Sequence, residues 1–229
     1  MREIVLDTET TGLDPADGHR IIEICCLELE GHLPTGKVFH TLVHPERDVP
    51  EDALRVHGLS IGKLSNAPVF ARVADEFLSF IADAPLIIHN AEFDLKFLNW
   101  ELQLAGKPSL SQNRGIDTIA LAKKRFPGAR YSLDELCRRF NIDLTARARH
   151  GARIDAELLA QVYLELIGGR QVRLALAPGD ARALTLDIVR VARIRPVPLA
   201  ERLAPSEREA HARFIASELD GDVIWRWAA

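Results

Sequence analysis

Cysteine is scarce in this chain of 229 residues, which has only three. They form no C-x-x-C pair, so the sequence disfavours both a structural zinc site and a disulfide framework. Reduced thiols are typical of cytoplasmic proteins, and we expect this protein in the cytoplasm. Cys25 and Cys26 are adjacent in an apolar segment typical of a strand, so their side chains should lie on opposite faces of a sheet.

Long apolar runs and an excess of positive charge are also missing. No stretch approaches the ~20 apolar residues that cross a bilayer, and the short run after Glu3 ends in acids, so we expect neither membrane span nor signal peptide. The chain has 29 basic and 33 acidic residues, a net charge of −4. It therefore has no overall basic field that would indicate nucleic acid. A nuclease is not excluded, because an acidic metal site and a local basic groove cancel in the sum.

Apolar periodicity predicts an α/β domain over residues 1–170. We expect strands at residues 3–7, 20–29, 37–43, 86–88 and 116–118. The first three are closely connected, which is typical of an antiparallel meander. We expect helices at residues 69–81, 92–104, 119–124, 132–140 and 156–167. This order of elements indicates a mixed sheet covered by helices. The apolar stripe of the second helix should contain Phe93, Phe97, Trp100 and Leu104.

The character of the sequence changes after Gly169. Residues 171–229 contain scattered prolines and short apolar clusters, and the one strong helical pattern among them covers residues 206–219. We therefore expect a flexible or partner-ordered tail and not a second domain.

The segment Asp7-Thr8-Glu9, directly after an apolar run, is the most informative stretch. Side chains alternate along a strand, so Asp7 and Glu9 should lie on the same face. Two carboxylates this close repel each other unless a positive charge lies between them. Oxygen ligands suit Mg2+ and Mn2+. Because many strands simply end in an acidic turn, this motif needs support from the rest of the chain.

Asp94 and Asp155 provide that support. Each lies near the start of a predicted helix, on the same face as apolar residues three and four positions further on. A buried carboxylate needs a partner. For either acid alone, the simpler partner is an arginine or the amides of the helix N-terminus. For both acids together with Asp7 and Glu9, a shared cation is the simpler account.

His150 precedes Asp155 by five residues, in the loop that leads into the helix. A loop histidine is often only solvated or a helix cap. Here Gly151 and Ala152 leave space beside the ring, and an ordinary pKa of about 6.5 suits removal of a proton from a metal-polarised water. We therefore regard His150 as a candidate general base.

In order and spacing, these residues resemble the three motifs of the DEDDh 3'-5' exonucleases. The matching segments are Asp7-x-Glu9, His89-Asn90-Ala91-x-Phe93-Asp94 and His150-x-Ala152-x-x-Asp155. The agreement extends over residues 3–170, and the family has a ribonuclease H-like fold. Arg153 stands where the third motif has an apolar residue. We expect its side chain to point outward, and the alternative is that it alters local substrate contacts.

The resemblance implies phosphodiester hydrolysis with two divalent metal ions, Mg2+ or Mn2+. Asp7, Glu9 and Asp155 would hold one ion. Asp7 and the substrate phosphate would hold the other, with Asp94 acting directly or through a water. His150 would take the proton of the attacking water, and the product would be a nucleoside 5'-monophosphate. The residues expected to contact the terminal nucleotide are Asp7, Thr8, Glu9, Thr10, Leu13, Val56, His57, Asn90, Phe93 and Asp155.

Two segments of the tail resemble peptides that bind partners. Gln171, Leu174 and Leu176 belong to six residues similar to peptides that bind the bacterial sliding clamp, although a plain linker is as good an account. Residues 207–225, which lead to Trp225 and Trp227, resemble the C-terminal segment of the epsilon-subunit family of bacterial DNA polymerase III. In that family the segment docks on the polymerase (alpha) subunit. An amphipathic helix followed by exposed tryptophans suits such docking, whereas the alternative is a helix packed on its own domain.

We therefore expect a proofreading 3'-5' exonuclease subunit that acts on single-stranded or frayed DNA 3' ends. Tethering to a polymerase raises the effective concentration, so a strongly basic surface is not required. A sliding clamp and a small stabilising subunit would be further partners. The alternatives are an RNA-trimming exonuclease of the same fold and a non-catalytic tether, and the complete set of four acids with His150 speaks against the tether.

Overall fold

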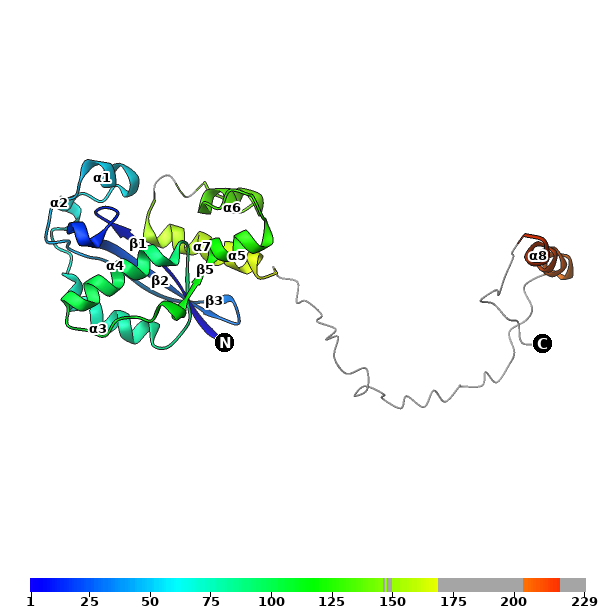
Figure 1. Ribbon diagram of the computed structural model, residues 1–229, viewed down its shortest axis with the longest axis horizontal. Helices are drawn as coiled ribbons and strands as arrows, with labels where there is room; N and C mark the ends of the chain where they lie inside the picture. Colours follow the sequence, from blue (N-terminus) through cyan, green and yellow to red (C-terminus); the bar gives the residue numbers. More distant parts are fainter. Residues whose placement is uncertain (146, 148–149, 169–203, 219–229) are drawn as a thin grey trace. The chain divides into compact units, whose positions relative to one another are not determined.

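The computed structural model describes residues 1–145, 147, 150–168 and 204–218 (Figure 1). The chain divides into two units, residues 1–174 and 175–229. The first contains the sheet and the predicted catalytic residues. Of the second, the structure describes a helix, α8 (Pro205–Glu218), together with the residue before it.

A five-stranded mixed sheet forms the centre of the first unit. Its strands, in the order β3-β2-β1-β4-β5, are β1 (Arg2–Thr10), β2 (Ile21–Glu30), β3 (Leu33–Leu42), β4 (Leu86–Ile88) and β5 (Gly115–Asp117). The first three form the predicted antiparallel meander, whereas β4 runs parallel to β1 and β5 parallel to β4. The carboxyl ends of β1, β4 and β5 therefore share one edge of the sheet with the start of β2.

Helices cover both faces of the sheet because both faces are apolar (Figure 1). On one face lie α3 (Phe70–Ile81) and α4 (Ala91–Leu104), and on the other lie α5 (Thr118–Arg125), α6 (Leu133–Arg139) and α7 (Ala152–Leu166). Cys25 and Cys26 are free thiols buried in opposite layers, as predicted. The connections contain the short elements η1 (Pro15–Asp17), α1 (Glu51–His57), α2 (Ile61–Leu64) and η2 (Gln112–Arg114).

The buried face of α4 differs from the predicted stripe. Trp100 and Leu104 are exposed, whereas Glu101 is buried. The carboxylate of Glu101 accepts two hydrogen bonds of 2.8 Å from Arg20 Nε and Nη2 and one of 3.2 Å from the backbone N–H of Ile21. This ion pair places a charged residue on the side of α4 that faces β2, so apolar spacing alone predicted the wrong face for the second half of the helix.

Three elements are longer than predicted, and two of them carry residues of the site. β1 continues to Thr10 because β2 supplies pairing partners as far as that residue. β3 begins at Leu33, and α7 begins at Ala152. Asp7 and Glu9 consequently lie inside a strand and not at its end, and Asp155 lies in the first turn of α7.

The predicted tail helix corresponds to α8. Polar residues predominate in it and Phe214 is largely exposed, so the described helix lacks the amphipathic stripe that we expected. None of the helices in the described part of the chain has the length and apolarity needed to cross a bilayer. The predicted boundary at residue 170 lies outside the described residues, as do Gln171, Leu174, Leu176, Trp225 and Trp227.

Candidate active site

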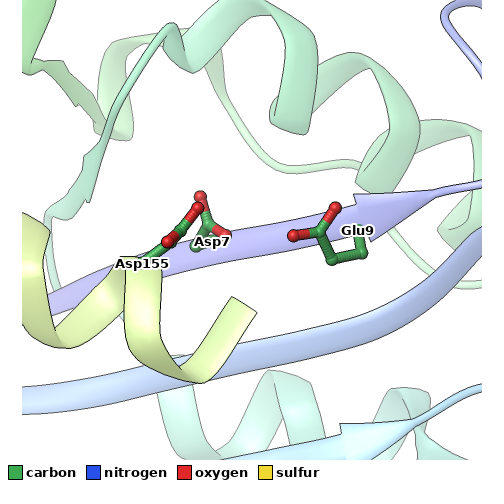
Figure 2. A group of neighbouring side chains, drawn as sticks. All are labelled: Asp7, Glu9 and Asp155. Carbon is green, nitrogen blue, oxygen red and sulfur yellow. The ribbon is translucent and has the colours of Figure 1, made fainter. Parts of the chain in front are cut away.

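Three carboxylates converge beside the last residues of β1 (Figure 2). Asp7 and Glu9 alternate with Thr8, so both acids point from β1 toward the layer that contains α7, while Thr8 points toward α4. Asp155 approaches from the first turn of α7. Ligand oxygens of Asp7, Glu9 and Asp155 all lie within 4.8 Å of one another. These carboxylates are close enough to bind one cation together.

Asp94 joins this group from the opposite layer. It is buried in the first turn of α4, and Thr8 Oγ1 donates a hydrogen bond of 2.7 Å to its Oδ1. Asn90 precedes α4 with a left-handed backbone (φ 70°, ψ 59°), which asparagine tolerates better than most residues, and so turns the chain from β4 into the helix. We call Asp7, Glu9, Asp94 and Asp155 the acidic cluster.

Burial opposes ionisation of Asp7, Glu9 and Asp94, and repulsion by neighbouring acids adds to this effect for Asp7 and Glu9. Burial raises the pKa of Asp7 well above its ordinary value, and the charges of the other three acids raise it further. Burial, followed by the charges of Asp155 and Glu23, raises the pKa of Glu9 to about 8. Burial raises the pKa of Asp94 to about 7 against the opposing effect of its hydrogen bonds with Thr8. A cation that replaces the protons would relieve this repulsion.

Asp155 has an internal cationic partner, Arg147. The Nε and Nη2 atoms of Arg147 donate hydrogen bonds of 2.6 Å to the two carboxylate oxygens of Asp155, and Nη1 binds Asp134 on α6. The Nδ1 atom of His150 lies 2.8 Å from Arg147 Nη2 and 3.2 Å from Asp155 Oδ2. The arginine that we considered as the simpler partner of Asp155 alone is therefore present, whereas the partner of Asp94 is a hydroxyl group.

His150 also connects the acidic cluster to α1. Its side chain is half exposed, and its backbone N–H donates to the carbonyl of Val56 at 3.3 Å. His57, which follows Val56 in α1, is only 6% exposed. Its Nδ1 accepts a hydrogen bond of 3.0 Å from the N–H of Leu59. Its Nε2 has no hydrogen-bond partner in the described part of the chain. An unpaired buried N–H lowers stability, so the Nε2–H group of His57 is a candidate donor to an acceptor atom of a ligand.

The other predicted nucleotide contacts lie in varied surroundings. Leu13, Val56 and Asn90 are exposed and available to a ligand. Thr10 Oγ1 donates to the carbonyl of Gly12 at 2.7 Å and so helps to turn the chain after β1. Phe93 is half buried and packs against Phe97, with ring centroids 5.0 Å apart.

Two charged residues beside the acidic cluster were not predicted from the sequence. Arg147 lies in a loop, where no periodic pattern marks it. Glu23 carried a signal that we did not use, because it is a charged residue inside the apolar run 21–27. It is buried and lies opposite Glu9 in the pairing of β1 with β2.

Comparison with known proteins identifies the family. The exonuclease family matches residues 4–163. The chain is 47% identical over 220 residues to the DNA polymerase III subunit epsilon of Rickettsia typhi, covering 94% of this chain and 96% of that protein. Over 237 residues it is 39% identical to the subunit epsilon of Escherichia coli, covering 98% and 97%. The chain belongs to the exonuclease family, among the epsilon subunits of DNA polymerase III.

Solved structures of other exonucleases share the fold. The nuclease domain of 3'hExo, described as a DEDDh family member bound to rAMP, superposes with a TM-score of 0.64 at 19% identity, covering 72% of this chain and 91% of that one. Exonuclease X in complex with 5' overhanging duplex DNA gives a TM-score of 0.56 at 21% identity, covering 72% and 90%. The predicted ribonuclease H-like fold is thereby confirmed for this member of the exonuclease family. Membership of this family implies divalent metal ions, and an oxygen-only donor set fits them.

Proposed function

We propose that this protein is the proofreading 3'-5' exodeoxyribonuclease of a bacterial replicative DNA polymerase, and that it releases nucleoside 5'-monophosphates from mispaired 3' ends. The main support is the convergence of Asp7, Glu9 and Asp155 within 4.8 Å, with Asp94 tied to the same strand by Thr8. The name of the relatives, DNA polymerase III subunit epsilon, supports DNA as the substrate.

Two divalent cations, Mg2+ or Mn2+, are the proposed cofactors. Asp7, Glu9 and Asp155 would hold one, and Asp7 with Asp94 would hold the other. When bound, such ions make water a better nucleophile and neutralise charge on the scissile phosphate. The raised pKa values of Asp7 and Glu9 support this assignment, because acids that repel each other in a buried place bind cations in exchange for protons.

The remaining residues of the site would move one proton and hold the terminal nucleotide. His150 would accept the proton of the attacking water, since it lies beside Asp155 on a half-exposed loop. His57 would donate its unpaired Nε2–H to an acceptor of the nucleotide. Burial lowers the pKa of His57, so its ring is neutral and carries its proton on Nε2 while Nδ1 accepts. The proposed surrounding contacts are Thr8, Thr10, Leu13, Val56, Asn90 and Phe93.

We propose that residues 1–170 are the exonuclease domain and that residues 171–229 join it to the replisome in the bacterial cytoplasm. Similarity to the Rickettsia typhi subunit covers 94% of the chain and thus continues past the exonuclease match, which ends at residue 163. Trp225 and Trp227 would contact the alpha subunit of the polymerase, and Gln171, Leu174 and Leu176 would contact the sliding clamp.

The deciding experiment is cleavage of primed DNA with a mispaired 3' end. We expect metal-dependent removal of single nucleotides, faster from mispaired than from paired DNA and faster than from RNA of the same sequence. Asp155→Asn should abolish cleavage. Glu157→Gln should not, because Glu157 lies on the same helix but is exposed and paired with Arg153. Faster cleavage of RNA would make the protein an exoribonuclease, and no cleavage with either metal would make it a tether.

A further inference from the structure

We propose that Glu23 is a positioning residue for the acidic cluster. It holds the first residue of α7 against the sheet and thereby fixes where Asp155 stands relative to Asp7 and Glu9. This inference rests on the proposed function, because it concerns the metal affinity of that cluster.

Glu23 joins two strands and a helix through its carboxylate. It lies near the start of β2, opposite Glu9 of β1, and is 7% exposed. Its Oε2 accepts a hydrogen bond of 3.1 Å from the backbone N–H of Ala152, and its Oε1 lies 2.7 Å from Nε2 of His40 on β3. Both oxygens thus have partners outside the acidic cluster.

The bond to Ala152 supplies what the start of α7 lacks. The first N–H groups of a helix have no partners within the helix, and the N-cap residue here is Gly151, which has no side chain to accept from them. Glu23 supplies the missing acceptor from another element and places a negative charge at the positive end of the helix. Asp155 lies three residues further on, so the start of α7 sets the position of its carboxylate.

The placement of Glu23 is electrostatically unfavourable in itself. Its charge is one of the causes that raise the pKa of Glu9. The hydrogen bonds from Ala152 and His40 offset this repulsion. The two oxygens of Glu23 are bound to Ala152 and His40, so it acts on the cluster through α7 and not as a ligand.

Glu3 provides a matched control at the other end of the same helix. It is 1% exposed on β1, and Tyr163 of α7 donates a hydrogen bond of 2.7 Å to its Oε1. Its Oε2 lies 2.7 Å from Nδ1 of His32, so its second partner is also an imidazole. Glu3 therefore ties α7 to the sheet as Glu23 does, but about two turns away from Asp155.

The test measures Mn2+ affinity of the full chain by electron paramagnetic resonance, beside thermal unfolding and steady-state cleavage. We expect Glu23→Ala to weaken Mn2+ binding about 10- to 100-fold, the usual effect of removing an outer-shell support, and to lower kcat more than it changes KM. Glu23→Gln keeps an oxygen that accepts from Ala152 and should retain most of the affinity. Glu3→Ala should lower the melting temperature and leave the Mn2+ affinity unchanged.

Several results would overturn the inference. One is an unchanged Mn2+ affinity in Glu23→Ala. Another is a loss of Mn2+ affinity in Glu3→Ala equal to that in Glu23→Ala. The third is a loss of Mn2+ affinity in Glu23→Gln as large as in Glu23→Ala. If Glu23→Ala does not fold, Ala152→Pro removes the donor instead, since proline suits the first helical position and Gly151 before it is extended (φ −170°, ψ 129°). It should show the same loss, and an unchanged affinity would refute the role. Absence of Mn2+ binding by the unaltered protein would overturn the proposed function itself.

Discussion

Asp7 is buried beside three other acids, which disfavours its ionised carboxylate and favours a bound cation. Its burial, and then the charges of Asp94, Asp155 and Glu9, raise its pKa, and the charge of Arg147 opposes them only in part. At the scale of single residues, the site should thus favour cation binding and be locally unstable when no metal is bound. Substitutions of Asp7 and of Thr8 test these two properties through cleavage and stability.

Asp7→Asn should reduce cleavage to background and stabilise the metal-free protein. The amide is neutral without binding a proton, so it avoids the cost that burial and three neighbouring acids impose on Asp7. About 1 kcal/mol of relief would raise the melting temperature by about 2–4 °C for a domain of this size. Calorimetry at pH 8 with a chelator measures the shift, and Asp17→Asn on the exposed η1 is the control. A lower melting temperature for Asp7→Asn would contradict this account of the repulsion.

Thr8→Val keeps the shape of the side chain and removes the hydroxyl that donates to Asp94. Loss of a donor to a buried acceptor should lower the free energy of unfolding by about 1–3 kcal/mol. The hydroxyl also holds down the pKa of Asp94, so without it that pKa should rise above about 7. Cleavage should consequently fall more at pH 7 than at pH 9, and a pH–rate profile identical to that of the unaltered protein would argue against this role.

At the scale of elements, three packing contacts determine where the acids stand. The parallel pairing of β1 with β4 places the start of α4 beside the end of β1, the bond from Ala152 to Glu23 places α7, and the pair of Arg20 with Glu101 fixes α4 against β2. The last contact involves no residue of the acidic cluster itself, so its effect is best measured as stability.

Glu101→Ala should lower the free energy of unfolding by about 3–5 kcal/mol, because it leaves the largely buried Arg20 with only the exposed Glu46 as an ionic partner. Urea unfolding measures the loss. Asp75→Ala removes an exposed acid paired with Lys107 and should cost no more than about 1 kcal/mol. Equal effects of the two substitutions would show that the Arg20–Glu101 pair contributes no more than a surface pair.

At the scale of the whole molecule, the raised pKa values link stability to pH and to metal. Asp7, Glu9 and Asp94 hold protons in the metal-free folded state at a pH where the unfolded chain has released them. The folded state then binds more protons than the unfolded state, so stability falls as pH rises through this range.

The metal-free protein should therefore be less stable at pH 8 than at pH 5.5, by at least about 1.4 kcal/mol, the value of one pKa unit. Mg2+ or Mn2+ should restore more stability at pH 8, because the ligands bind metal in their deprotonated form. Chemical denaturation at both pH values, with and without metal, measures the effect. Stability that rises with pH in the absence of metal would contradict the assignment.

A chain that ends at Gly168 should keep metal-dependent cleavage of mispaired DNA, because the acidic cluster, Arg147 and His150 all precede that residue. It should no longer form a complex with the polymerase alpha subunit in size-exclusion chromatography. The full chain with Trp225→Ala and Trp227→Ala is the matched control and should behave like the truncated chain. Stable binding of the truncated chain would place the docking surface in the exonuclease domain.

Local periodicity was enough to predict much of the fold and the faces on which the acids lie. The alternation of a strand put Asp7 and Glu9 on one face, and helical spacing put Asp94 and Asp155 on buried faces near helix starts. These are properties of neighbouring residues, so the sequence carries them directly. The same holds for the start of α6 near the predicted residue 132, where Ser132 Oγ accepts from the N–H of Glu135 and caps the helix.

Tertiary structure alone decided which residues meet. The contacts Thr8–Asp94, Arg147–Asp155 and Ala152–Glu23 join different elements, and no spacing rule specifies such pairs. The buried face of α4 likewise depends on an ion pair with residue 20, some eighty positions away. The sequence by itself determined that the acids would be buried and would need a partner, because burial follows from local pattern. Their common position, and the supports that hold it, follow from the packing of both helical layers on one sheet.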